Sequence, residues 1–137
     1  MKQILQSLNT GATIIAELPA PTAARGQLLI SSALTLLSAG TERMLMDFGK
    51  ANWIDKAHQQ PDKVKLVIEK ARTDGLLPTL EAVRSKLDKP LALGYCNVGT
   101  VVAIGEGVSG FQLGDRVASN GPHAELVAVP QHLCVSI

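Results

Sequence analysis

The sequence predicts a mainly β domain, a small and partly open β-barrel, with a helical insertion at about residues 42–88. Hydrophobic residues alternate with a period of two near both ends of the chain, and the period changes to about 3.6 residues in the middle. No regular β-α-β alternation is present. At 137 residues, of which 46% are hydrophobic, the chain has the size of one domain with a single core. We therefore treat residues 1–137 as one domain.

The amino-terminal part is predicted to be a hairpin followed by one long strand. Residues 2–8 and 12–17 have strand character, and the turn at 9–11 contains Asn and Gly, which supply the backbone angles of a tight turn. Residues 27–37 form a long apolar run, as expected for a strand that is buried on both faces. We expect this strand to cross the core.

The middle of the chain is predicted to be helical. Pro61 suits the first turn of a helix, Gly75 is placed to end it, and Pro78 suits the start of another. We expect the apolar face of each helix to be buried, that is Val64, Val67, Ile68 and Ala71 in the first helix and Leu80, Val83 and Leu87 in the second. The charged side chains fall mainly on the outer faces, where solvation is their simplest role.

The last third of the chain returns to short strands, at about residues 98–104, 116–119, 124–129 and 134–137. Within it, residues 105–110 satisfy the G-x-G-x-x-G pattern of dinucleotide-binding turns. That pattern binds a pyrophosphate only where a helix follows it, and Gly114 with Gly-Pro at 121–122 leaves no room for such a helix. We therefore predict that these glycines lie in turns between strands.

The composition excludes several classes of function. A net charge of +1 offers no strong field for nucleic acid or an anionic membrane, and the few aromatic residues leave no stacking platform for single strands. No apolar run approaches the roughly 18 residues of a membrane span, and no signal peptide is recognisable. Cys96 and Cys134 are too few for a disulfide scaffold. We expect a cytoplasmic, soluble protein.

Three segments together resemble the GroES-like amino-terminal domain of medium-chain, zinc-type alcohol dehydrogenases and quinone reductases. They are the Gly-Glu-Gly-Val turn at 105–108, residues 111–117 with their Gly-Asp-Arg-Val ending, and residues 123–130. The resemblance implies a β-barrel-like substrate domain, which in relatives is followed by a Rossmann domain that binds NAD or NADP. We expect that domain to be absent from this chain, which would then be a truncated piece or a natural module of a longer oxidoreductase. The cofactor-binding residues stay unknown.

Other segments are similar to narrower groups. Residues 38–44, 72–86 and 94–97 look like bi-domain oxidoreductases, in which a dehydrogenase-like half is fused to a sugar-oxidoreductase half. The Ser-x-Gly-Thr-Glu element at 38–42 is also similar to that of bacteriochlorophyllide dehydrogenases. The resemblance implies a small-molecule substrate, a sugar-derived or other alcohol or carbonyl compound. The substrate itself and the choice between NAD and NADP stay open.

The positions that hold the catalytic zinc of the family carry other residues here. The family uses a Cys in a Cys-Gly-Ser/Thr-Asp element and the His, sometimes also the Glu, of a Gly-His-Glu element. The corresponding residues are Ala39, Tyr95 and Cys96. A single thiolate cannot supply the three protein ligands that a catalytic zinc requires. We predict no zinc at this site.

Without zinc, hydrogen bonds must stabilise the developing alkoxide, and a side chain must handle its proton. The candidate catalytic residues are Thr41, which matches the family's proton-relay Ser/Thr, Glu42, which stands where its Asp stands, and Tyr95, which carries a further hydroxyl. Two alternatives stay open. Thr41 and Glu42 can cap the first inserted helix, and Tyr95 can be a wall of the cleft, because an unperturbed phenol with a pKa of about 10 needs a cationic neighbour.

Four further residues are candidates for lining the substrate cleft: Cys96, Asn97, Asn120 and His123. In relatives, the segment that contains His123 lies along the cleft between the domains, where His123 could donate to substrate or cofactor. The alternative is a loop histidine in solvent. Cys96 has no basic neighbours in the sequence, which favours inert packing over a reactive thiol.

Two functions from different classes fit these observations. The first is the substrate-binding domain of an NAD(P)-dependent, alcohol dehydrogenase-like oxidoreductase without zinc, inactive by itself. The alternative is a non-catalytic interaction module, in which the helical insertion with Trp53, Met44 and Met46 docks a partner protein.

Overall fold

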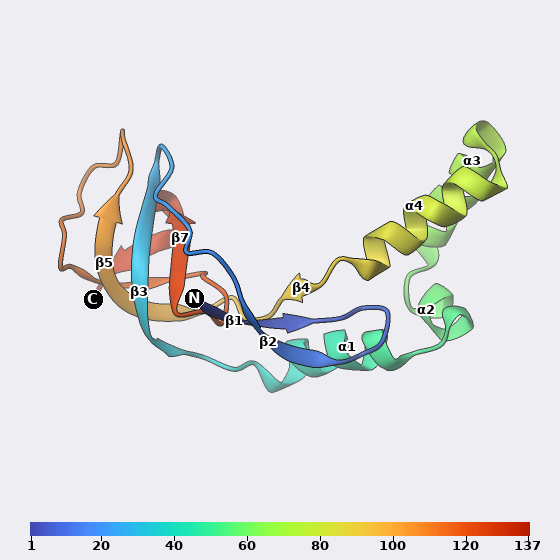
Figure 1. The fold of residues 1–137 in the computed structure, drawn as a ribbon, viewed down its shortest axis with the longest axis horizontal. Helices are drawn as coiled ribbons and strands as arrows, with labels where there is room; N and C mark the ends of the chain where they lie inside the picture. The colour runs from blue at the N-terminus through green and yellow to red at the C-terminus, as the bar shows by residue number, and fades with distance from the viewer. The chain divides into compact units, whose positions relative to one another are not determined.

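The computed structural model describes all residues 1–137, which divide into two compact units. The β-rich unit consists of Met1–Leu5, Ile15–Glu42 and Ala92–Ile137, and the helical unit consists of Gln6–Ile14 and Arg43–Leu91. The elements along the chain (Figure 1) are β1 (Lys2–Gln6), β2 (Thr13–Glu17), β3 (Gln27–Thr35), α1 (Ala39–Lys50), α2 (Trp53–Gln59), α3 (Pro61–Asp74), α4 (Leu76–Asp88), β4 (Leu91–Ala92), β5 (Asn97–Ile104), β6 (Arg116–Ser119), β7 (Leu126–Pro130), a 3-10 turn at Gln131–Leu133, and β8 (Cys134–Ser136).

A five-stranded sheet in the order β7-β3-β5-β6-β8 holds the core of the β-rich unit. Its paired strands are antiparallel, and β3 lies between β7 and β5 (Figure 1). Alternate residues of a strand point to the same face, so Leu28 and Ile30 of β3 share a face and are fully buried. Together with four valines they form the core: Leu28, Ile30, Val101, Val117, Val127 and Val129.

The predicted fold class is confirmed, since eight strands in two sheets are combined with four α-helices, and the sheets do not close into a complete barrel. The second sheet has the order β2-β1-β4, and the predicted amino-terminal hairpin forms its first two strands. Gly11 turns this hairpin with a φ of 72°, in the left-handed region that favours glycine.

The glycines of the G-x-G-x-x-G pattern lie in the connection between β5 and β6, and no helix follows them. The prediction of turns between strands is therefore confirmed. Gly105 is tightly packed, because a Cβ atom there would overlap the carbonyl oxygen of Ala24 and lie 2.7 Å from its carbonyl carbon. This close approach of two backbone segments explains a glycine at this position without any nucleotide.

The long strand differs from its prediction, because β3 ends at Thr35 and its last part is exposed on the surface. Leu34, Leu36 and Leu37 are 66–73% exposed. β7 accompanies β3 only as far as Ser31, whereas β5 continues to Thr35, so the exposed part begins where β3 has a strand neighbour on one side only. The expectation of burial on both faces was wrong there.

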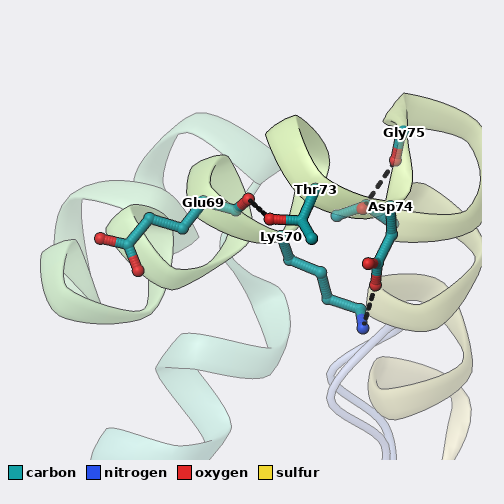
Figure 2. A network of polar contacts seen from close by, with 6 residues as sticks. Glu69, Lys70, Thr73, Asp74 and Gly75 are labelled. Atoms are coloured by element: carbon teal, nitrogen blue, oxygen red, sulfur yellow. Dashed lines mark hydrogen bonds and ion pairs between the residues drawn. The ribbon is translucent and has the colours of Figure 1, made fainter.

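The helix bounds follow the predicted signals. α3 begins at Pro61 and ends before Gly75, which has a φ of 93°. Beyond this end, the Thr79 hydroxyl donates to the Gly75 carbonyl at 2.8 Å. In the last turn of α3, Lys70 Nζ lies 2.7 Å from Asp74 Oδ2 (Figure 2). Such an exposed pair contributes only a few tenths of a kcal/mol, about 0.3–0.5.

The predicted burial of the helix faces was wrong for α3, which has no buried residue, and for α4, where Thr79 is the buried residue and Leu80 is 44% exposed. The apolar side chains of α3 are on the surface, with Leu66 64% and Ile68 48% exposed. A helix that packs on a neighbouring helix alone keeps much of its apolar face in solvent. None of the four helices is long and apolar enough to cross a membrane.

Candidate functional site

The first turn of α1 places two of the candidate side chains, Thr41 and Glu42, in the β-rich unit. The Ser38 N–H donates to Glu42 Oε1 at 3.1 Å, and the Glu42 N–H donates to the Ser38 carbonyl at 3.0 Å. The Ser38 and Thr41 hydroxyl oxygens lie 3.4 Å apart. The Glu42 carboxylate therefore satisfies a free amide of the helix start and carries the negative charge that the helix dipole favours there. The capping alternative holds for Glu42, with Ser38 as its partner.

Glu42 also pairs with His123, from the segment that precedes β7. Glu42 Oε1 and His123 Nε2 are 3.0 Å apart, and both side chains are buried, with only 7% and 5% of their surfaces exposed. His123 is therefore not the solvent-exposed loop residue that one alternative described. The pair joins residues 81 positions apart, and no spacing in the sequence predicts it.

The other ring nitrogen, His123 Nδ1, is buried and has no hydrogen-bond partner. Nε2 is the ring nitrogen that faces the carboxylate, so an N–H at Nε2 donates to Glu42 Oε1.

Tyr95 lies beside this turn and is half-exposed. The Ser38 hydroxyl, and after it the Thr41 hydroxyl, lower the pKa of Tyr95 below its ordinary value of 10.0 by hydrogen bonding, while slight desolvation and the charges of Glu42 and Cys96 act in the opposite direction. From the sequence, a cationic neighbour of Tyr95 was expected. The structure supplies hydroxyls instead, which stabilise the phenolate as donors.

The four expected cleft residues differ in position. Cys96 is partly exposed next to Tyr95, and Asn120 is exposed. Asn97 is fully buried, its Nδ2 donates to Ser32 Oγ at 2.7 Å, and its Oδ1 has no partner. Asn97 and His123 thus lie beneath the surface, where a substrate has no access in this conformation.

The residues present do not fit a catalytic zinc. No group of three His, Cys, Asp or Glu side chains lies together so that it could hold a metal ion. The facing atoms of two possible donors at this site, Glu42 and His123, are already hydrogen-bonded to each other. A catalytic zinc requires three protein ligands and an open position.

Residues 71–137 match the family model of the alcohol dehydrogenase GroES-like domain. This matched segment, just under half of the chain, is similar to the GroES-like domain of alcohol dehydrogenases. The resemblance to a GroES-like domain, drawn from the motifs, is thereby confirmed over these residues. No curated protein matches the chain by sequence.

Several solved structures share the GroES-like fold. The mycobacterial protein Rv1454c, solved in complex with NADPH, has a TM-score of 0.61 at 20% identity, and the chain covers 34% of it. A quinone oxidoreductase from Coxiella burnetii has a TM-score of 0.61 at 19% identity, with 36% of it covered. Galactitol-1-phosphate dehydrogenase from Escherichia coli has a TM-score of 0.64 at 15% identity, with 38% covered. These matches cover 99–100% of the chain, which thus spans about a third of each protein.

Proposed function

We propose that this GroES-like domain forms the substrate side of an NAD(P)-dependent oxidoreductase that interconverts an alcohol and a carbonyl compound without zinc. The observation that carries the proposal is the cluster of three hydroxyls, from Ser38, Thr41 and Tyr95, with a lowered pKa for Tyr95 and the Glu42 carboxylate beside it. The fold supports the class, because it is shared with oxidoreductases. The nicotinamide would be held mainly by a Rossmann domain outside these residues.

The cluster can handle the proton of the reaction. When bound, the nicotinamide supplies a hydride to the carbonyl carbon of the substrate. Tyr95 gives its proton to the carbonyl oxygen, and the hydroxyls of Ser38 and Thr41 stabilise the phenolate that remains. Because Tyr95 is half-exposed, water can return the proton directly. In the oxidation direction the same groups act in reverse.

The candidate cleft residues have different roles in this proposal, according to their exposure. Cys96 and Asn120 are at the surface and would contact a small-molecule substrate, a sugar-derived or other alcohol or carbonyl compound. Asn97 would support the wall from behind through its bond to Ser32. Two of the fold relatives, a quinone oxidoreductase and galactitol-1-phosphate dehydrogenase, are the reason to test quinones and sugar alcohols first. A cytoplasmic location remains part of the proposal.

The test uses the natural polypeptide that contains this chain. We expect turnover that depends on NAD or NADP, a loss of about 100-fold or more in kcat for Tyr95→Phe, and a smaller loss for Thr41→Val. Thr73→Val is the matched control, because Thr73 is an exposed threonine of the helical unit whose hydroxyl bonds its own helix. We also expect no zinc at stoichiometric occupancy. Failure to bind either dinucleotide, or full activity of Tyr95→Phe, would contradict the proposal.

A second function is favoured by the surface of the helical unit. Trp53 is 50% and Met44 60% exposed, and Trp53 lines a hollow of about 280 Å³. Exposed aromatic and methionine side chains are frequent at protein interfaces. The alternative is therefore an interaction module. It predicts that Trp53→Ala abolishes association with a partner protein, whereas Tyr95→Phe changes nothing.

A further inference from the structure

The Glu42–His123 pair has no role in the proton transfer described above, yet it is the most completely buried polar contact at the site. Nε2 of His123 and the Ser38 N–H converge on the same carboxylate oxygen, Oε1, at 3.0 and 3.1 Å. The second oxygen, Oε2, has no protein donor and is not among the buried unpaired atoms, so it retains contact with solvent. One oxygen of Glu42 is anchored while the other is available.

We propose that His123 is a positioning residue that anchors Glu42 and thereby fixes a carboxylate charge beside the hydroxyl cluster of Ser38, Thr41 and Tyr95. This inference rests on the proposed function of Tyr95 as proton donor. It differs from the earlier expectation, because His123 acts through Glu42 and contacts neither substrate nor cofactor.

The surroundings of His123 leave its ring one position. The backbone N–H of His123 donates to the Leu93 carbonyl at 2.8 Å, and the backbone carbonyl of His123 accepts from the Ile4 N–H at 2.9 Å, so its backbone is held on both sides. The ring packs directly on Gly94, where a Cβ atom would lie 2.7 Å from Cγ and Nδ1 of the ring. A side chain confined in this way can hold its partner in a fixed place.

The anchored carboxylate has a defined effect on Tyr95. The charged groups that act on the phenol are Glu42 from α1 and Cys96, the residue that follows Tyr95 in the sequence. Both raise the pKa of Tyr95, whereas the hydroxyls lower it. A fixed negative charge keeps the phenol protonated and ready to donate, whereas the hydroxyls stabilise the phenolate afterwards. His123 sets the balance between these two effects by holding Glu42 in place.

The experiment follows the titration of Tyr95 by the near-ultraviolet absorbance of its phenolate, as a difference from Tyr95→Phe in the natural polypeptide. Tyr95 is the single tyrosine of residues 1–137. His123→Leu removes the donor to Glu42, and His123→Gln keeps an N–H donor at the end of a side chain of similar length. Glu42→Gln removes the charge directly. Ser32→Ala is the matched control, because it breaks another buried hydrogen bond of the same unit, to Asn97.

We expect His123→Leu and Glu42→Gln to move the Tyr95 midpoint to lower pH, because both take the carboxylate charge from its side. The double variant should shift no further than either single one. His123→Gln and Ser32→Ala should titrate as the unmodified protein does. In turnover, His123→Leu should lower kcat roughly tenfold with little change in KM, and His123→Gln should recover it.

An unchanged midpoint in Glu42→Gln, or in His123→Leu when Glu42→Gln shifts, would overturn the inference. If His123→Leu does not fold, Glu42→Gln and His123→Gln still decide, because the inference requires a shift in the first and none in the second. Failure of the proposed function has a different signature. In that case the midpoints move as expected, and Tyr95→Phe retains full turnover.

Discussion

Replacing Gly105 by alanine tests whether the glycine-rich turn serves backbone packing. The new methyl group would overlap the Ala24 carbonyl oxygen and lie 3.0 Å from the Gln27 carbonyl oxygen, so the backbone itself must move. Three backbone hydrogen bonds meet there: Gly105 N–H to Gln27 at 2.8 Å, Gln27 N–H to Ala24 at 3.0 Å, and Gly26 N–H to Glu106 at 2.8 Å. At about 1 kcal/mol each, their disruption costs about 3 kcal/mol.

A loss of that size is a large part of the stability of a small domain, which is about 5–15 kcal/mol. Urea denaturation followed by far-ultraviolet circular dichroism measures it, and with an m-value of about 2 kcal/mol/M the midpoint should fall by roughly 1.5 M. Gly107→Ala is the control. It has a φ of 80° but no atom closer than 3.8 Å to an added Cβ, so only backbone strain of about 1–2 kcal/mol is expected. The reasoning is refuted if Gly105→Ala is no more damaging than Gly107→Ala.

Three further outcomes follow from the structure. Ser38→Ala should return the pKa of Tyr95 toward its ordinary value, measured by phenolate absorbance. In the unmodified protein the pKa of Tyr95 is lower in the folded state than in the unfolded state, so ionisation of Tyr95 adds stability as the pH rises from the lowered pKa to about 10. Ser38→Ala should narrow the pH range over which this stability is gained. Lys56→Met should reduce the free energy of unfolding by about 1–2 kcal/mol in thermal melts, because the Gly49 carbonyl near the end of α1 loses the buried ammonium that donates to it. Burial raises the pKa of the Cys134 thiol, so with single-cysteine variants at neutral pH Cys134 should react with iodoacetamide more slowly than Cys96.

Much of the fold could be predicted from the sequence because its signals are local. Pro61 and Gly75 act on their own backbone, and the structure begins and ends α3 there. Alternating apolar residues likewise predict strands, and the glycines of 105–110 predict turns. Burial was predicted less well, because it depends on which neighbour covers a face. Leu34, Leu36 and Leu37 lie where β7 no longer pairs with β3 or beyond the end of β3, and the apolar pattern of residues 27–37 does not show that this part is exposed.

The candidate site shows the same division. Thr41, Glu42 and Tyr95 were chosen from motifs that stand about 50 residues apart, and the structure brings their segments together around Ser38. The bond between Glu42 and His123 could not be predicted, since each residue had been considered separately and the contact depends on the path of the whole chain. Ser38 was missed as a functional residue. The signal was its position immediately before a helix, which favours a serine at the cap.

The pairing of β3 with β5 has a consequence for how this protein folds. These neighbouring strands of the sheet are separated in sequence by residues 36–96, which contain all four helices. Closing a segment of roughly 60 residues costs about 2 kcal/mol more chain entropy than closing a four-residue turn. The helices can form within microseconds from local contacts, whereas the central pair of strands must wait for a distant encounter. We therefore expect the helices of residues 36–96 to form before β3 pairs with β5. Shortening this segment should accelerate folding without altering the register of the sheet.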